Sequence, residues 1–189
     1  MLILEVGIKL DKDVNYYDEL LRNNGFNRIF ETKIHDLYYT NQNLDGLTEN
    51  EMKTACIRIR GFGNEPYKVQ NKLLGEVTTQ RVFQDELQEF ESELAKYGYK
   101  RVFDTFKDDY HYTKPGMTNR IQLQQIKDIG LLVYYDNSDY YEYDLETQRR
   151  KLIDDLNSFG FNFDYNVLGV DKLRTLYYHK EMYSKNQNG

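Results

Sequence analysis

GFNRIFETKIHDLYYT (25–40) and GYKRVFDTFKDDYHYT (98–113) are two stretches of this chain that align without a gap. Seven of the sixteen aligned positions are identical, and several others exchange one aromatic, aliphatic or acidic residue for another. The identical pairs are Gly25/Gly98, Arg28/Arg101, Phe30/Phe103, Thr32/Thr105, Asp36/Asp109, Tyr39/Tyr112 and Thr40/Thr113. Chance explains this agreement poorly, so we infer that the chain contains an internal repeat.

A predicted helix precedes each copy of the repeat. Residues 13–24 and 85–97 carry apolar side chains at helical spacing, and residues 144–159 show the same pattern. Each of the three stretches ends in a glycine followed by an aromatic residue, as expected where a left-handed residue terminates a helix. The sequence therefore predicts a repeated unit of helix, glycine stop and strand, with a third helix added.

Alternation of polar and apolar residues predicts several strands. Residues 2–10 alternate cleanly, and the same period recurs at 57–60, 120–124 and 133–136. This pattern fits an antiparallel sheet with helices on one face and water on the other. It fits equally well a barrel whose polar face points inward.

Length and composition indicate one soluble domain covering residues 1–189. A hydrophobic fraction of 40 % is ordinary, and a net charge of −6 argues against a general nucleic-acid binder, although it allows a locally basic pocket. The single cysteine, Cys56, excludes an intramolecular disulfide, and we find neither a secretory signal nor a long apolar run. We therefore expect a cytoplasmic protein without membrane association.

Several short motifs follow one another along the chain in a recognisable order. Glu5-Val6-Gly7-Ile8-Lys9 matches a Glu-x-Glu-x-Lys strand at its first and last positions. Asp36-Leu37-Tyr38-Tyr39 then matches an Asp-x-Tyr-Tyr strand, and Ile57-Arg58-Ile59-Arg60 matches a strand with two arginines on one face. In this order the motifs resemble the CYTH superfamily of class IV adenylyl cyclases and thiamine or inorganic triphosphatases.

The resemblance covers nearly the whole chain and implies a fold. It predicts an α+β protein with a duplicated antiparallel β-barrel or tunnel and flanking helices. The two related halves would cover about 1–75 and 76–140, followed by C-terminal helices. Residues 171–180 are expected to form a helix that packs on the barrel, closes one tunnel mouth or simply covers the surface.

The resemblance also implies a site in which basic side chains hold a triphosphate and carboxylates hold Mg²⁺ or Mn²⁺. The phosphate-binding candidates in this chain are Lys9, Arg58, Arg60, Lys68, Lys107 and Arg120. The metal-binding candidates are Glu5 and Asp136, with Glu142 or Asp144 added if the last strand continues inward. Other positions where the family has acids carry Gly7, Thr78, Gln80, Gln124 and Tyr134.

Three functions follow from this mixture of retained and replaced residues. The first is binding of a polyphosphate, nucleotide or other phosphorylated anion with weak or lost metal-dependent catalysis. The second is an active Mg²⁺- or Mn²⁺-dependent triphosphatase or class IV adenylyl cyclase, for which the sequence assigns no catalytic residue. The third is a protein-interaction module on the same scaffold. Related proteins suggest a homodimer.

Overall fold

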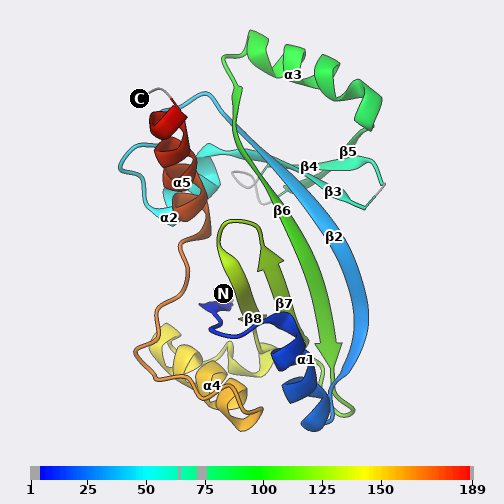
Figure 1. The fold of residues 1–189 in the computed structure, drawn as a ribbon, viewed down its shortest axis with the longest axis vertical. Helices are drawn as coiled ribbons and strands as arrows, with labels where there is room; N and C mark the ends of the chain where they lie inside the picture. The colour runs from blue at the N-terminus through cyan, green and yellow to red at the C-terminus, as the bar shows by residue number, and fades with distance from the viewer. Residues whose placement is uncertain (1–4, 64, 72–75, 188–189) are drawn as a thin grey trace. The chain divides into compact units, whose positions relative to one another are not determined.

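The computed structural model describes residues 5–63, 65–71 and 76–187. Eight strands form one sheet in the order β1-β8-β7-β6-β2-β3-β4-β5, and the pairs with a defined register are antiparallel (Figure 1). Because β1 and β5 stand at the two ends of this order, the sheet formed by the described strands is open. The α+β class and the antiparallel sheet are confirmed, and closure into a barrel stays a prediction.

The predicted elements are present with small changes at their ends. The strands are β1 (Val6–Lys9), β2 (Asn27–Thr40), β3 (Ile57–Phe62), β4 (Tyr67–Asn71), β5 (Glu76–Val82), β6 (Lys100–Thr113), β7 (Ile121–Ile126) and β8 (Gly130–Tyr135). The α-helices are α1 (Val14–Asn23), α2 (Glu49–Ala55), α3 (Leu87–Lys96), α4 (Leu145–Ser158) and α5 (Lys172–Gln187). Of the predicted strand at 2–10, residues 2–4 lie outside the described part of the chain. The short helix α2 was not predicted.

Two compact units divide the chain. The first unit combines residues 1–32, 108–126 and 130–170, and the second combines 33–107, 127–129 and 171–189. The long strands β2 and β6 are neighbours in the sheet, and each contributes one end to each unit. None of the described helices has the length and apolarity needed to cross a bilayer.

The core of the first unit forms between its strands and two helices. Apolar side chains of β1, β7 and β8 that alternate along the strands pack with Tyr17 and Leu21 of α1 and with Leu152 and Leu156 of α4. The aromatic Phe161, just after α4, joins this cluster. The amphipathic spacing seen in the sequence thus buries one face of each helix against the sheet.

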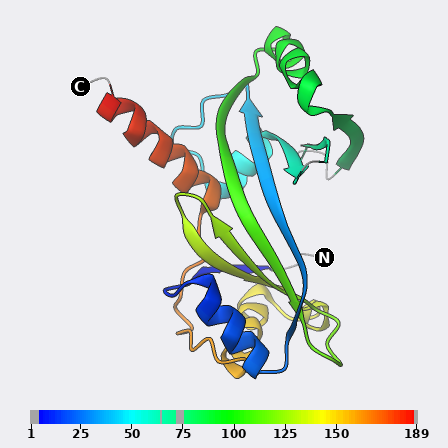
Figure 2. The same ribbon diagram turned by 45° about the vertical axis from the view of Figure 1, so that its right-hand side comes forward.

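The core of the second unit lies on one face of β2, β3 and β4. Leu37, Tyr39 and Ile59 are buried there, and Phe90 and Leu94 of α3 pack against them. On the other side of these strands, α2 and α5 contact each other (Figures 1 and 2). The Glu49 carboxylate of α2 accepts a hydrogen bond from the backbone N–H of Leu173 (2.8 Å), which fixes the first turn of α5.

The three predicted glycine stops have the same geometry. Gly25, Gly98 and Gly160 have φ values of 81°, 79° and 95°, in the left-handed region that favours glycine. The aromatic residue after each glycine donates its backbone N–H to a carbonyl in the last turn of the preceding helix. The predicted helix ends are therefore confirmed.

Aligned residues of the two repeats also make equivalent contacts. In the second unit the Tyr39 hydroxyl donates to Glu91 of α3 (2.8 Å), and in the first unit the Tyr112 hydroxyl donates to Asp18 of α1 (2.8 Å). Asp18 and Glu91 occupy matching positions in the two helices that precede the repeats. Each unit thus joins the helix of one repeat to the strand of the other.

Candidate functional site

A buried carboxylate organises the polar face of the second unit. Asp36 on β2 has no solvent exposure, and the Arg60 guanidinium donates to both of its oxygens through Nε (2.6 Å) and Nη2 (2.8 Å). Asp36 and Arg60 are cross-strand partners, so the register of β2 and β3 sets this two-pronged ion pair. The fully buried Lys107 ammonium of β6 also donates to Asp36.

Two further cations act on the same carboxylate. Arg58 is the register partner of Tyr38, on the face of β3 that also carries Arg60. Lys172, in the first turn of α5, lies close enough to interact electrostatically with Lys107, Asp36, Arg60 and Arg58. Among the side chains that the structure describes, four cationic groups of the second unit therefore lie around the Asp36 carboxylate. We call Asp36, Arg58, Arg60, Lys107 and Lys172 the cation cluster.

Titration of the cluster reflects its burial and its excess of positive charge. Burial alone would raise the pKa of Asp36, but the Arg60 hydrogen bonds and the neighbouring cations hold this pKa well below its usual range. Burial lowers the pKa of Lys107 to about 8, although the Asp36 charge opposes this shift. Burial, reinforced by the Lys107 charge, lowers the pKa of Lys172 to about 7. An added anion would relieve the repulsion among these cations.

Thr105 supplies a polar group next to the cluster. It lies two residues before Lys107, and therefore on the same face of β6. Its side chain is buried, and within the described part of the chain its hydroxyl oxygen has no hydrogen-bond partner. A buried hydroxyl normally has such a partner, so a ligand that reached this face would satisfy it.

Lys68 has a different environment from the cluster. It is the register partner of Arg60, but its ammonium lies over the Phe62 ring, 5.3 Å from the centroid. A cation–π contact of this kind stabilises the ammonium charge but does not orient its N–H groups. Lys68 thus adds positive charge to the same rung of the sheet.

The first unit brings three of the other predicted charged residues together. Arg120, Glu5 and Asp136 all line one pocket of about 300 Å³, to which Tyr134 and Gln122 also contribute. Among the described residues, no group of three or more His, Cys, Asp or Glu side chains is placed to hold a metal ion. The two carboxylates can therefore offer Mg²⁺ or Mn²⁺ only part of an oxygen shell, the rest of which would come from water and substrate.

A second buried aspartate lies beside this pocket. Asp109, aligned with Asp36 in the repeat, accepts hydrogen bonds from Gln122 (2.6 Å) and from Nε2 of His111 (2.9 Å). Burial would raise the pKa of Asp109, but these hydrogen bonds keep it lowered. Because an ionised carboxylate can only accept, Nε2 carries the hydrogen and Nδ1 is the acceptor in the neutral ring.

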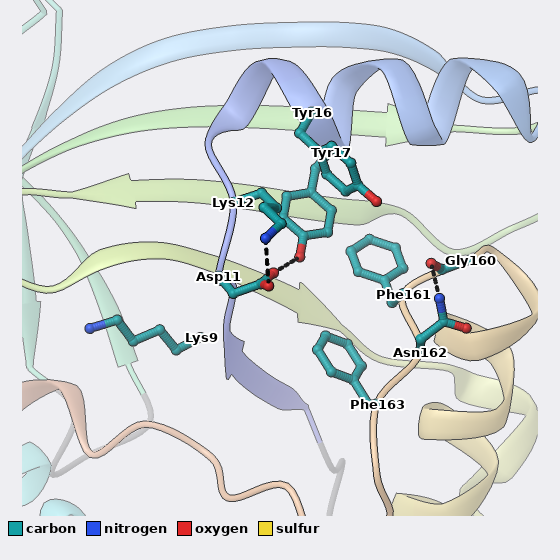
Figure 3. A pocket seen from close by; sticks show the side chains of 9 residues that line it. All are labelled: Lys9, Asp11, Lys12, Tyr16, Tyr17, Gly160, Phe161, Asn162 and Phe163. Carbon is teal, nitrogen blue, oxygen red and sulfur yellow. Dashed lines mark hydrogen bonds and ion pairs between the residues drawn. The ribbon is translucent and has the colours of Figure 1, made fainter.

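Lys9 lies at a different pocket of the first unit, about 370 Å³ in volume. Tyr16 and Tyr17 of α1 and the segment 160–163 line this pocket, in which the Tyr17 and Phe161 rings stack at 5.4 Å. Figure 3 shows the Lys9 ammonium pointing away from these rings. Lys9 and Arg120 therefore lie in two separate pockets of the first unit.

Gly7 and Tyr134, two of the positions at which the resemblance predicts acids, lie against each other. Gly7 and Tyr134 are register partners, and a Cβ atom at residue 7 would lie 2.7 Å from the Tyr134 ring. The ring thus occupies the space that a carboxylate at residue 7 would need. The side chains of Thr78 and Gln80 lie outside the described residues, and Gln124 is buried.

The condition under which Glu142 or Asp144 would join the metal site, that the last strand continues to them, is not met. Strand β8 ends at Tyr135, before both residues. The Asp144 carboxylate instead accepts the backbone N–H groups of Glu146 and Thr147, both at 3.0 Å, and caps α4. An aspartate immediately before a helical pattern is a common N-cap, so the sequence contained the signal for this role.

Sequence reasoning missed two members of the cation cluster. Lys172 follows an aspartate at the start of a predicted helix, and its sequence gives no sign that it reaches the β2–β3 strands. Asp36 was recognised as part of a motif but was not named as a site residue. The sequence did contain a hint, because an aspartate is present at this position in both copies of the repeat. Most of the other identical residues are apolar, aromatic or hydroxyl-bearing.

Comparison with solved structures identifies similar folds at low sequence identity. A provisionally assigned adenylate cyclase from Vibrio parahaemolyticus is 14% identical, covers 82% of this chain and 87% of its own, and gives a TM-score of 0.51. The PH1012 protein of Pyrococcus horikoshii is 12% identical, with 85% and 92% covered and a TM-score of 0.55. A conserved hypothetical protein of Pyrococcus furiosus is 14% identical, with 87% and 100% covered and a TM-score of 0.54.

No protein-family model and no curated protein matches the sequence. At these identities the solved structures establish a shared fold and nothing about activity. A fold shared with a provisionally assigned adenylate cyclase is consistent with the CYTH-like fold that the motifs predict.

Proposed function

We propose that this chain is a cytoplasmic protein that binds a triphosphate, a nucleotide or another phosphorylated anion at the cation cluster of the second unit, with weak or lost metal-dependent catalysis. The observation that supports the proposal is the gathering of four cationic side chains around the buried Asp36 carboxylate, counted over the described residues. An anion bound among these side chains would relieve their mutual repulsion.

Each member of the cluster has a distinct part in this proposal. Asp36 holds Arg60 in a fixed direction, so its guanidinium is preorganised. Arg58 would present a planar fork to phosphate oxygens, while Lys107 and Lys172 would supply point charges. The Thr105 hydroxyl would donate a further hydrogen bond. We further propose that this face lines the interior of a tunnel, to which Lys68 adds a cation on the same rung as Arg60.

Metal-dependent catalysis is the second candidate, as a triphosphatase or an adenylyl cyclase. The observation that favours it is the presence of Glu5 and Asp136 in one pocket with Arg120, together with the fold shared with a provisionally assigned adenylate cyclase. A bound Mg²⁺ or Mn²⁺ would neutralise charge on the transferring phosphoryl group. We rank this candidate second because Gly7 and Tyr134 stand where the family has carboxylates.

Thermal stabilisation by tripolyphosphate and by ATP tests the proposal, because a ligand of the native state raises apparent stability. Each ligand is measured with and without Mg²⁺ or Mn²⁺ in wild type, in Arg58→Gln and in Lys172→Met. We expect stabilisation without metal that is strongly reduced in both variants. Lys96→Gln, an exposed charge at the end of α3, is the matched control and should respond as wild type does.

The other outcomes separate the alternatives. Stabilisation that requires metal would favour the enzyme and justify assays for released phosphate and cyclic nucleotide. A response that is equal in wild type and both variants would place the anion elsewhere on the molecule. No response at any ligand concentration would reject anion binding and leave the protein-interaction module.

A further inference from the structure

The 300 Å³ pocket of the first unit has charges of both signs on its walls. Arg120 contributes a guanidinium, and Glu5 and Asp136 contribute carboxylates. Within the described residues, the side chains of Arg120 and Asp136 make no ion pair or hydrogen bond, although both face this hollow. Arg120 and Asp136 are opposite charges that share this pocket without pairing, which leaves room for a ligand between them.

A simple anion or a simple cation fits this pocket poorly. Two carboxylates on the wall, with ionised Asp109 behind it, would repel a phosphate that approached Arg120. Arg120 would in turn repel a monovalent amine that approached Asp136. A ligand that carries a positive group at one end and a negative group at the other satisfies both walls, because each end meets its opposite charge.

His111 adds a hydrogen-bond acceptor to the same pocket. His111 lines the pocket, and its Nε2–H donates a hydrogen bond to the buried Asp109 carboxylate. The same carboxylate accepts a second hydrogen bond from the Gln122 side-chain amide. The ring is therefore held in the tautomer in which Nδ1 accepts a hydrogen. An ammonium group, with three N–H donors, is suited to a carboxylate and an imidazole acceptor together.

We propose that this pocket binds a small zwitterion with a primary ammonium and a carboxylate or phosphate group. The anionic group pairs with Arg120, and the ammonium pairs with Asp136 and Glu5 and donates to His111. This pocket uses none of the residues of the cation cluster, so the proposal does not rest on the function proposed above.

Amino acids of increasing length serve as probes of this site. Glycine, β-alanine, γ-aminobutyrate and 6-aminohexanoate place the same two charges at growing separations, and O-phosphoethanolamine replaces the carboxylate by a phosphate. Binding is measured from amide chemical-shift changes of the full chain in two-dimensional NMR spectra. We expect changes centred on residues 118–122 and 134–136, with one chain length preferred. Acetate and methylammonium, which carry one charge each, should bind about tenfold more weakly or worse.

Variants link binding to the two walls of the pocket. Arg120→Gln and Asp136→Asn should each weaken binding of the preferred zwitterion by about tenfold, because each leaves one ligand charge unpaired. Arg150→Gln and Glu19→Gln remove exposed charges of the same signs elsewhere in the first unit and should bind as wild type does. Arg58→Gln, in the second unit, should also leave zwitterion binding unchanged.

Three results would overturn the proposal. One is the absence of chemical-shift changes with every probe up to millimolar concentrations. Another is equal binding of acetate or phosphate alone, which would make the pocket a plain anion site. The third is binding of phosphate only when Mg²⁺ is added, which would make Glu5 and Asp136 metal ligands instead. Spectra that retain their dispersion in the variants show that a loss of binding is not a loss of folding.

Discussion

Asp36 and Asp109 occupy the same position in the two repeats, yet their surroundings differ. Both side chains are buried, and both have a partner two residues further along the strand, Tyr38 for Asp36 and His111 for Asp109. Across the strands, however, Asp36 meets Arg60 and Lys107, whereas Asp109 meets the neutral amide of Gln122. Asp36 is thus surrounded by cationic side chains, whereas Asp109 is bound by an amide and an imidazole.

The difference shows how a repeated scaffold can place the same aspartate in two different charge environments. A strand position that buries an aspartate fixes where a partner must lie, because cross-strand neighbours are set by register. The identity of that partner then decides the local charge. In the second unit the partners exceed the carboxylate in charge, which favours an anion. In the first unit they do not, and carboxylates line the adjoining pocket.

Replacing each aspartate by asparagine should give the largest difference in stability between the two units. Asp36→Asn leaves several buried cations without their counter-ion, so we expect a loss of about 3–5 kcal/mol in the free energy of unfolding. Asp109→Asn removes hydrogen bonds to neutral or titratable partners and should cost about 1–2 kcal/mol. Urea denaturation followed by circular dichroism measures both. Equal losses would mean that the cations around Asp36 are already compensated by other groups.

The lowered pKa values of two lysines predict that anion binding to the second unit depends on pH. Lys172 and Lys107 have folded-state pKa values lowered to about 7 and about 8, so the cation cluster loses charge as the pH rises through this range. Anion binding favours the protonated forms, and affinity should therefore fall by about tenfold or more between pH 6 and pH 9. Sulfate is a suitable probe because it does not titrate there. Calorimetry with Lys172→Met should show a flatter profile, and a flat profile in wild type would contradict the lowered pKa values.

The same lysines set the direction of the pH dependence of folding. In the unfolded chain a lysine holds its proton up to about pH 10. Between pH 7 and pH 10 the unfolded state therefore binds more protons than the native state, and stability increases with pH. Lys172→Met should reduce this increase. The contribution of Asp36 has the opposite origin, since its lowered pKa stabilises the native state at neutral pH and is lost only in acid.

Substituting alanine at each of the three glycine stops should distinguish the cost of a left-handed backbone from the cost of a close contact by the added Cβ. Gly25 and Gly98 have positive φ, but an added Cβ would meet its nearest neighbour at 3.5 Å and 3.8 Å, an ordinary contact. We expect each substitution to cost about 1–2 kcal/mol from the left-handed backbone alone. At Gly160 the added Cβ would also lie 2.9 Å from Cδ1 of Leu20, so the cost should be larger. Thermal unfolding ranks the three, and a cost at Gly160 below the other two would contradict the crowding.

Local patterns in the sequence identified most elements, because their physical causes are local. The glycine stops depend on backbone conformation, and the arginine strand depends on alternation, so Arg58 and Arg60 could be placed on one face before the structure was known. Lys172 could not be placed, because its approach to Asp36 depends on how α5 packs. Lys9 and Arg120 likewise could not be assigned to different pockets, because the packing of distant segments decides which residues line each pocket. The Gly7–Tyr134 contact depends on strand register, which alternation alone does not specify.

The matched tyrosines allow the finest comparison of the two units. Tyr39 donates to Glu91 in the second unit, and Tyr112 donates to Asp18 in the first, each at 2.8 Å, and both rings are buried. Replacing either tyrosine by phenylalanine removes one hydrogen bond to a partly exposed carboxylate and leaves the ring in place. We expect similar losses of about 1 kcal/mol for Tyr39→Phe and Tyr112→Phe in urea denaturation. Because the two pairs share no residue, the double variant should lose the sum of the two values. Losses that differ by more than twofold would show that the equivalent contacts do not carry equivalent energies, and that the two repeats differ in more than their aspartate partners.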